Sequence, residues 1–167
     1  MNGSALFSDC RTWRYSLTRE LTGVRRMVFV GLNPSTADEE ADDPTIRRCV
    51  GFARDWGFAR LDVVNIYAFR ATDPRALWAA DDPVGPENDR VLVQVVGSAD
   101  LVVAAWGVWA RRDRVRDLAG ILARVPLYAL GAAKEGAPRH PLYVRADAQP
   151  TPYEFPLLGD DGRGQGV

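Results

Sequence analysis

Three polar side chains in this sequence are candidates for binding or catalysis because of their types and positions. Asn33 follows the apolar run 27–32, Asn65 lies within a second apolar run, and His140 is the only histidine. A buried carboxamide without partners costs about 1–3 kcal/mol, so Asn65 needs a reason for its position. A carboxamide offers a donor beside an acceptor, and a neutral imidazole has one N–H to donate. Together these groups suit a flat, polar ligand such as a nucleobase.

Two of these residues also have an ordinary structural interpretation. Asparagine before proline is common in turns, because its side chain bonds the local backbone while Pro34 fixes the next dihedral angle. Similarly, a histidine before Pro141 is compatible with an exposed loop. Both interpretations stay open for Asn33 and His140 on the sequence alone.

The remaining candidate chemistry concerns metals and cofactors. The acidic stretch 38–43 offers the oxygen ligands that Mg²⁺ prefers, but we favour a solvated loop whose last member, Asp43, caps the next helix. The two cysteines, Cys10 and Cys49, are too few for an iron–sulfur cluster or a four-cysteine zinc site. Phosphate-binding loops, dinucleotide fingerprints and nucleophile elbows do not occur in a suitable context. We therefore expect neither a metal nor a cofactor.

The composition fits one globular domain. The chain has 167 residues, with 21 basic and 22 acidic side chains and a formal charge of −1. Lys134 is the only lysine, and arginine favours forked contacts with phosphate or carboxylate. A charge near zero argues against generic coating of nucleic acid but allows a local basic groove. The apolar runs are shorter than the roughly 20 residues of a membrane-spanning helix, and no secretory signal opens the chain, so we expect a cytoplasmic monomer without membrane contact.

The hydrophobic pattern alternates between strands and helices. Apolar runs predict strands at 13–18, 27–32, 61–67, 101–105 and 127–130, and helical spacing predicts helices at 44–56, 75–80, 86–97 and 111–124. In the first strand, Trp13, Tyr15 and Leu17 alternate with polar residues that include Arg14, which is the period of a half-buried strand. This order is typical of an α/β fold with a mainly parallel sheet between helical layers. We expect a single α/β domain at 1–158 and a disordered tail at 159–167.

In such a sheet, ligands bind at the carboxyl ends of the strands. Polar and aromatic residues follow the predicted strands at these ends, and all should face one opening. They are Gly31, Asn33, Ser35, Asn65, Phe69, Arg70, Lys134, Arg139 and His140.

Several motifs together resemble the DUF1643 family of bacterial proteins. They are Gly31 to Asp38, Asp43 to Arg48, Asn65 with Ala71 to Pro74, and Gly85 to Asp89. The resemblance covers about residues 13–143. It implies no defined biochemical activity.

A more distant resemblance is to the uracil-DNA glycosylase superfamily, in particular its mismatch-specific branch. Gly31 to Ser35 is similar to its first motif, and His140 with Pro141 is similar to the start of its last motif. The resemblance implies a three-layer αβα sandwich with a four-stranded, mainly parallel sheet, to which we add an N-terminal edge strand. It also implies that Asn33 positions the attacking water and that Asn65 reads the base. The serine-containing phosphate loop of that superfamily is replaced here by 142–145.

These observations lead to one expected function and two alternatives. We expect an N-glycosidase that removes uracil or a related base from single- or double-stranded DNA. Asn33 and His140 are its catalytic residues, and Gly31, Ser35, Asn65 and Phe69 bind the base. Arg70, Lys134 and Arg139 contact phosphate or nucleic acid. The candidates for a stacking aromatic are Phe52, Tyr67, Phe69 and Trp106. The alternatives are a binding module without catalysis and a glycosidase acting on free nucleosides or nucleotides.

Overall fold

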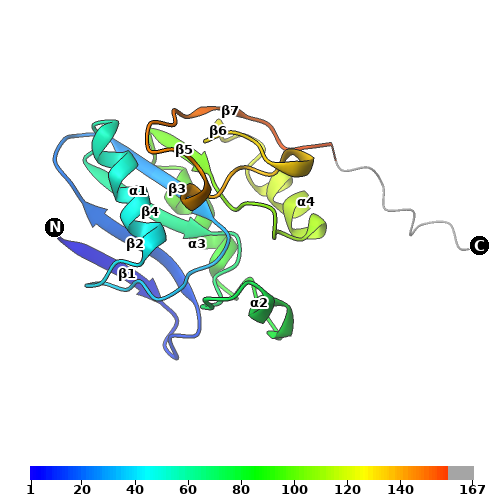
Figure 1. Cartoon of the computed structure of the whole chain (residues 1–167). Coiled ribbons are helices and arrows are strands. Elements are labelled where there is room, and N and C mark those ends of the chain that lie inside the picture. Colours follow the sequence, from blue (N-terminus) through cyan, green and yellow to red (C-terminus); the bar gives the residue numbers. More distant parts are fainter. Residues whose placement is uncertain (158–167) are drawn as a thin grey trace, which may run out of the picture.

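After three opening strands, strands alternate with helical segments up to residue 129, as the computed structural model in Figure 1 shows. The structure describes residues 1–157, and the tail expected at 159–167 lies outside the described residues. The α/β class that the hydrophobic pattern predicts is confirmed.

Within residues 1–157, seven strands form one sheet in the order β1-β2-β4-β3-β5-β6-β7. Strands β4, β3, β5 and β6 are parallel to one another, while β1, β2 and β7 pair antiparallel. The prediction of a four-stranded sheet is wrong, because antiparallel strands extend both edges. Edge strands β1 and β7 are largely exposed, so no apolar run in the sequence predicts them. The strand bounds are Gly3–Phe7 (β1), Arg14–Glu20 (β2), Arg26–Gly31 (β3), Arg60–Asn65 (β4), Leu101–Ala104 (β5), Leu127–Ala129 (β6) and Thr151–Tyr153 (β7).

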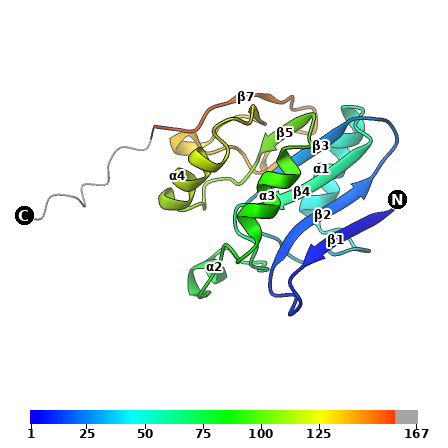
Figure 2. The ribbon, with the colours of Figure 1, turned by 180° about the vertical axis from the view of Figure 1, so that it is seen from behind.

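Helices cover both faces of the sheet. Helix α1 packs on one face, and α2, α3 and α4 pack on the other, as Figure 1 and the reverse view in Figure 2 show. Successive side chains of β3 alternate between these two layers: Met27 and Phe29 face α1, whereas Val28 and Val30 face the other helices. Among residues 1–157, every helix is too short or too polar to cross a membrane. The helix bounds are Pro44–Asp55 (α1), Arg75–Ala79 (α2), Asn88–Val96 (α3) and Arg112–Ile121 (α4), with short 3-10 turns at Lys134–Gly136 (η1) and Pro141–Tyr143 (η2).

Helix α1 begins where its capping residue predicts. The carboxylate Oδ1 of Asp43 accepts a hydrogen bond from the backbone N–H of Ile46 at 2.9 Å, and Pro44 is the first helical residue. Gly57 follows the helix with a φ of +73°, a conformation that favours glycine. The cap therefore fixes the start of α1.

A β-bulge in β2 changes which side chains face the core. Leu6 pairs with Ser16, but the next residue, Phe7, pairs with Arg14, so Tyr15 has no residue opposite it. A bulge of this kind bends the strand and re-aims its side chains. Regular alternation groups Arg14 with the polar side of the strand, yet only 2% of Arg14 is exposed. The bulge turns this arginine into the interior.

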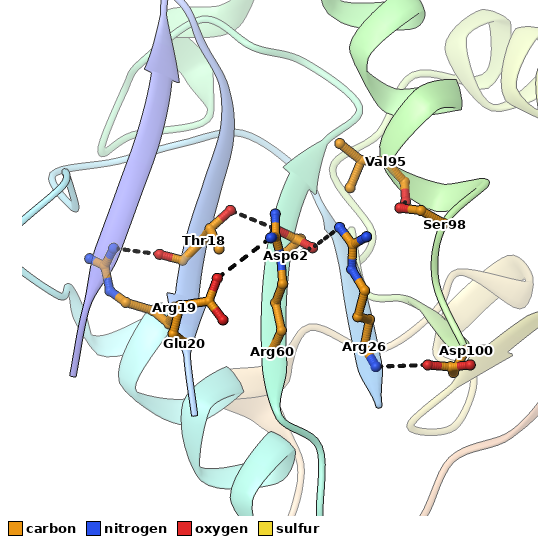
Figure 3. Close-up of polar contacts among 9 residues, drawn as sticks. All are labelled: Thr18, Arg19, Glu20, Arg26, Arg60, Asp62, Val95, Ser98 and Asp100. Atoms are coloured by element: carbon orange, nitrogen blue, oxygen red, sulfur yellow. Dashed lines mark hydrogen bonds and ion pairs between the residues drawn. The ribbon is translucent and has the colours of Figure 1, made fainter. Parts of the chain in front are cut away.

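A polar cluster joins three strands at the end of the sheet where the parallel strands begin (Figure 3). Asp62 accepts hydrogen bonds from the hydroxyl of Thr18 at 2.5 Å and from Nε of Arg60 at 3.0 Å. Arg26 donates to the same carboxylate at 3.3 Å. These partners compensate the buried charge of Asp62. The cluster ties β2, β4 and β3 together at the end opposite the carboxyl ends of the parallel strands.

Candidate functional site

Two adjoining cavities open at the carboxyl ends of the parallel strands. We call the larger, of about 650 Å³, the outer cleft and the smaller, of about 50 Å³, the inner hollow. This is the edge at which ligands bind in sheets of this class. Because the cavities share part of their lining, a ligand in the outer cleft lies next to the inner hollow. The shared residues are Leu32, Asn33, Ser35, Asp43, Thr45 and His140.

Asn33 is oriented by the turn that it forms. Its Nδ2 donates to the carbonyl of Pro34 at 3.0 Å and to that of Ala71 at 2.8 Å. The backbone N–H of Ala71 in turn donates to the carbonyl of Pro34 at 2.9 Å, which ties the loop after β3 to the loop after β4. Both amide protons are therefore used. The side-chain oxygen Oδ1 is left for a ligand or water.

Asn65 ends β4 with a buried carboxamide that lines the inner hollow. The residue is 3% exposed, and its Nδ2 has no hydrogen-bond partner within the described residues. Its Oδ1 lies against Gly31, where an added Cβ would approach to 2.8 Å. A buried donor without a partner is costly unless water or a ligand supplies an acceptor. Asn65 thus lines the hollow and has a buried donor without a partner in the described chain.

His140 is a neutral imidazole with a defined tautomer. Its Nδ1 accepts a hydrogen bond from the backbone N–H of Leu142 at 3.2 Å, which leaves the ring proton on Nε2. Burial lowers the pKa of His140 below its ordinary value, and the nearby carboxylate of Asp43 opposes this effect. At neutral pH the ring is therefore uncharged, and it offers Nε2–H as a donor.

The segment that carries His140 is held from two sides. Arg48 of α1 donates through Nε to the carbonyl of Pro141 at 3.2 Å and through Nη2 to the carbonyl of Val144. On the other side, the backbone N–H of Gly107 donates to the carbonyl of Pro138 at 2.8 Å. Gly107 has a φ of +72°, which favours glycine. Arg48 and Gly107 are therefore positioning residues for the imidazole.

Two buried side chains hold the end of β4, where Asn65 lies. Nδ2 of Asn88 in α3 donates to the carbonyl of Asn65 at 2.8 Å. Nε of Arg114 in α4 donates to the carbonyl of Ile66 at 2.9 Å, and the same guanidinium pairs with Asp89 at 2.5 Å. Carbonyls past the end of a strand need such donors when they are buried. The layer of α3 and α4 thereby sets the position of Asn65.

Sequence reasoning missed Arg14 as a site residue. Arg14 lines the inner hollow together with Asn65 and His140. Its Nη1 donates to the carbonyl of Ala37 at 2.9 Å, whereas its Nε is buried without a partner in the described part of the chain. The sequence did not indicate this role, because the alternation of polar and apolar residues cannot reveal the bulge in β2. Asp43, predicted only as a helix cap, also lines both cavities.

The structure brings most of the predicted site residues together. Gly31 lines the inner hollow beside Asn33, Asn65 and His140. Ser35 lines both cavities, and Arg139 lines the outer cleft. The role of each residue in ligand binding stays a prediction.

Three predicted contact residues lie elsewhere. Phe69 forms an isolated β-bridge with Trp13, and the guanidinium of Arg70 packs over the ring of Phe7. Lys134 lines a separate cavity of about 260 Å³. Phe69, Arg70 and Lys134 line neither the outer cleft nor the inner hollow.

Aromatic side chains surround the outer cleft. Of the four candidates for a stacking residue, only Trp106 lines the cleft, and it is 1% exposed. Trp109 and Tyr143 also line it and are 52% and 79% exposed. Aromatic faces at the mouth of a cleft suit the stacking of a flat ring. Trp109 and Tyr143 are thus stacking candidates that sequence reasoning did not single out.

The acidic loop before α1 uses its charges locally. Asp38 accepts hydrogen bonds from the backbone N–H groups of Glu40 and Ala41 at 2.9 and 2.8 Å, and Asp42 accepts one from Arg19 at 2.8 Å. Among residues 1–157, no three or more histidine, cysteine or acidic side chains form a group that could hold a metal ion.

Comparison with known families identifies the family to which the chain belongs. Residues 14–142 match the family described as protein of unknown function (DUF1643), and the match covers more than half of the chain. The chain belongs to the DUF1643 family. In this DUF1643 protein the matched range includes Arg14, Asn33, Asn65 and His140. No curated protein and no solved structure matches the chain.

Proposed function

We propose that this DUF1643 protein is an N-glycosidase that hydrolyses the bond between a sugar and uracil or a related base. The observation that carries the proposal is that Asn33, Asn65 and His140 line one small hollow, each with an unused polar group. The comparisons give no support to the resemblance between this chain and the uracil-DNA glycosylase superfamily. The proposal therefore rests on the geometry.

Recognition of the base falls to Asn65 and His140. The carboxamide of Asn65 has a donor and an acceptor side by side, which match the carbonyl and the ring N–H of an imide edge. The Nε2–H of His140 donates to a base oxygen on which negative charge develops. A neutral donor of fixed orientation is suited to this task, because it needs no reorganisation as the charge appears. Trp109 and Tyr143 stack on the ring or on a neighbouring base.

Hydrolysis follows on the sugar side. Water held by Oδ1 of Asn33 attacks the anomeric carbon as the bond from carbon to nitrogen breaks. The electron pair of that bond goes to the base, the hydroxyl joins the sugar, and the released proton passes to the base. A carboxamide is a weaker proton acceptor than a carboxylate, so we expect a slow reaction. Asp43 adds a negative charge beside the cavities as the sugar becomes cationic.

One observation favours a binding module without catalysis. Both oxygens of Asp43 already accept backbone hydrogen bonds, from Ile46 at 2.9 Å and from Ala37 at 3.4 Å. No other carboxylate lines either cavity within the described residues. The site would then hold a nucleotide without an effective base for water. The assay below separates the two functions.

The test is cleavage of uracil-containing substrates. Single- and double-stranded oligonucleotides with one uracil are incubated with the protein, with and without EDTA, and then treated with alkali to break the strand at sites that have lost a base. In parallel, the protein is incubated with free deoxyuridine, and the release of uracil is measured. We expect strand scission that EDTA does not change. A band shift without scission would support the binding module.

Variants connect the activity to the site. We expect His140→Ala and Asn65→Ala to lower the rate, since each removes a donor at the hollow. Arg90→Ala is the matched control, because this exposed arginine lies on α3 and lines neither cavity. Full activity in both site variants would mean that catalysis resides elsewhere on the protein.

A further inference from the structure

Arg14 differs from the other buried arginines of the described chain. Arg19 and Arg114 are equally inaccessible, and each pairs with an aspartate, at 2.8 and 2.5 Å. Arg14 is 2% exposed, makes no ion pair within residues 1–157, and donates only Nη1, to the carbonyl of Ala37. Its Nε is fully buried and has no hydrogen-bond partner among these residues. The guanidinium is therefore a buried charge with spare donor capacity.

Such an arrangement costs stability. Removing an ion from water carries a penalty of several kcal/mol, which a close counterion would offset. Burial lowers the pKa of Arg14 to about 10, and the charge of Asp43 partly opposes the shift. Arg14 thus keeps its positive charge at neutral pH. An anionic group in the inner hollow would supply the missing counterion.

The three donor side chains at the hollow, one of them a cation, suit an anionic base better than a neutral one. Arg14, Asn65 and His140 line the hollow. Their donors without a partner among the described residues are the buried Nε–H of Arg14, the buried Nδ2–H of Asn65 and Nε2–H of His140. A neutral imide edge interleaves a ring N–H donor between two carbonyl oxygens. Loss of that proton, or arrival of the glycosidic electron pair, turns the ring into an anion whose charge is spread over its oxygens. The anion fits three donors and a cation better than the neutral ring does.

We propose that Arg14 is a catalytic residue that binds the anionic oxygen of the departing base, so that the inner hollow selects the anionic form of a pyrimidine-like ring. This inference rests on the proposed function. When the glycosidic bond breaks, its electron pair moves onto the base, and Arg14 stabilises the resulting charge while keeping its own proton. The base takes up the proton released from the attacking water. Stabilisation of this kind acts in the transition state more than in the substrate.

The test compares two small pyrimidine rings that share an imide edge and differ by one ring oxygen. Uracil is neutral at neutral pH, whereas barbituric acid has the same imide edge and is an anion. Their dissociation constants are measured by isothermal titration calorimetry on the full chain. A charge-assisted hydrogen bond predicts that wild-type protein binds barbiturate roughly tenfold to a hundredfold more tightly than uracil. Arg14→Met should abolish this preference, and Arg14→Lys, which keeps the charge, should retain part of it.

Arg26→Met is the matched control, because Arg26 belongs to the cluster at the opposite end of the sheet (Figure 3). It should leave the preference unchanged. If Arg14→Met does not fold, the ¹⁵Nε signal of Arg14 in the wild-type protein serves instead, with Arg14→Lys to assign it. Barbiturate should shift that signal.

The outcomes separate this inference from the proposed function. Equal binding of both rings, a preference that survives Arg14→Met, or an unmoved Nε signal would overturn the role of Arg14, while uracil binding would still support a base site. Binding of neither ring would overturn the role of Arg14 as well. The oligonucleotide assay then decides separately whether the glycosidase proposal survives.

Discussion

Replacing Gly31 with alanine should disable the site while the fold persists. Gly31 ends β3 directly beside Asn65 at the end of β4. A Cβ at this position would lie 2.8 Å from Oδ1 of Asn65, whereas ordinary contacts begin near 3.4 Å. Gly31 is not among the glycines with positive φ, so alanine causes no backbone strain there. The side chain of Asn65 must therefore move by about 0.6 Å.

The expected effect on function exceeds the effect on stability. Overpacking of a core typically lowers the free energy of unfolding by about 1–3 kcal/mol. Replacing glycine by alanine at a compatible position raises it by about 0.4–1 kcal/mol. The net loss should therefore be about 0–2.6 kcal/mol. Displacing a binding group by a sizeable fraction of an ångström, in contrast, should lower kcat/KM and ring affinity on the order of tenfold to a hundredfold.

Gly51→Ala is the control for Gly31→Ala. Gly51 lies within α1, and a Cβ added there meets nothing within 4 Å. Alanine should stabilise the helix by about 0.5–1 kcal/mol without changing ligand binding. Calorimetry of uracil and barbiturate, thermal unfolding, and the side-chain amide NMR signal of Asn65 measure these effects. A folded Gly31→Ala protein with wild-type affinities and an unmoved amide signal would refute the role assigned to Asn65.

Three further predictions test the surroundings of the site. The pKa of His140 should lie below 6.5, the ordinary value of a histidine. As the pH falls, the imidazole of the unfolded protein therefore binds a proton before that of the folded protein, so stability should fall as the pH drops from 6.5 through the folded pKa. The NMR signal of the single histidine reports this titration. Asp43→Ala should remove the cap of α1 and cost about 1 kcal/mol, a fall in Tm of about 2–4 °C by calorimetry, whereas Asp43→Asn should preserve most of the cap. Hydrogen bonds between Cys10 and the side chains of Ser8 and Thr12 lower the pKa of the exposed Cys10 thiol to about 7, while burial raises the pKa of Cys49. Iodoacetamide labelling followed by mass spectrometry should therefore modify Cys10 alone in the native protein. Rapid labelling of Cys49 would contradict the packing described for α1.

Local rules in the sequence predicted much of the framework around the site. The buried strand 27–32 and the cap at Asp43 follow from a continuous apolar run and from a short polar residue before proline. Parallel strands bring their carboxyl ends to one edge, so the grouping of Asn33 and Asn65 could be expected without coordinates. An N-terminal edge strand was expected, but the first predicted strand, 13–18, corresponds to β2, which lies inside the sheet between β1 and β4. The actual edge strands, β1 and β7, were not predicted, because they bury too little apolar surface to leave a pattern.

The bulge in β2 explains why Arg14 could not be found in this way. Alternation assumes a constant register, and one additional residue reverses the side of the sheet on which every earlier side chain lies. Tyr15 is that additional residue, and nothing in its type distinguishes it from a regular strand residue. The placement of Phe69 and Arg70 was missed for a related reason: beyond the end of β4, the loop rather than the strand direction decides where a side chain goes.

For Asn33 and His140, the ordinary and the functional interpretations are compatible. Asn33 does form a turn, and the two hydrogen bonds of that turn consume its donors and leave Oδ1 free. His140 likewise caps the short η2 turn through Nδ1, and this bond leaves the proton on Nε2. In each case the local structural bond fixes which atom remains for a ligand. If the turn of Asn33 were its only role, Asn33→Asp should affect stability alone; we expect it to alter binding or cleavage as well, because it adds a negative charge beside the hollow.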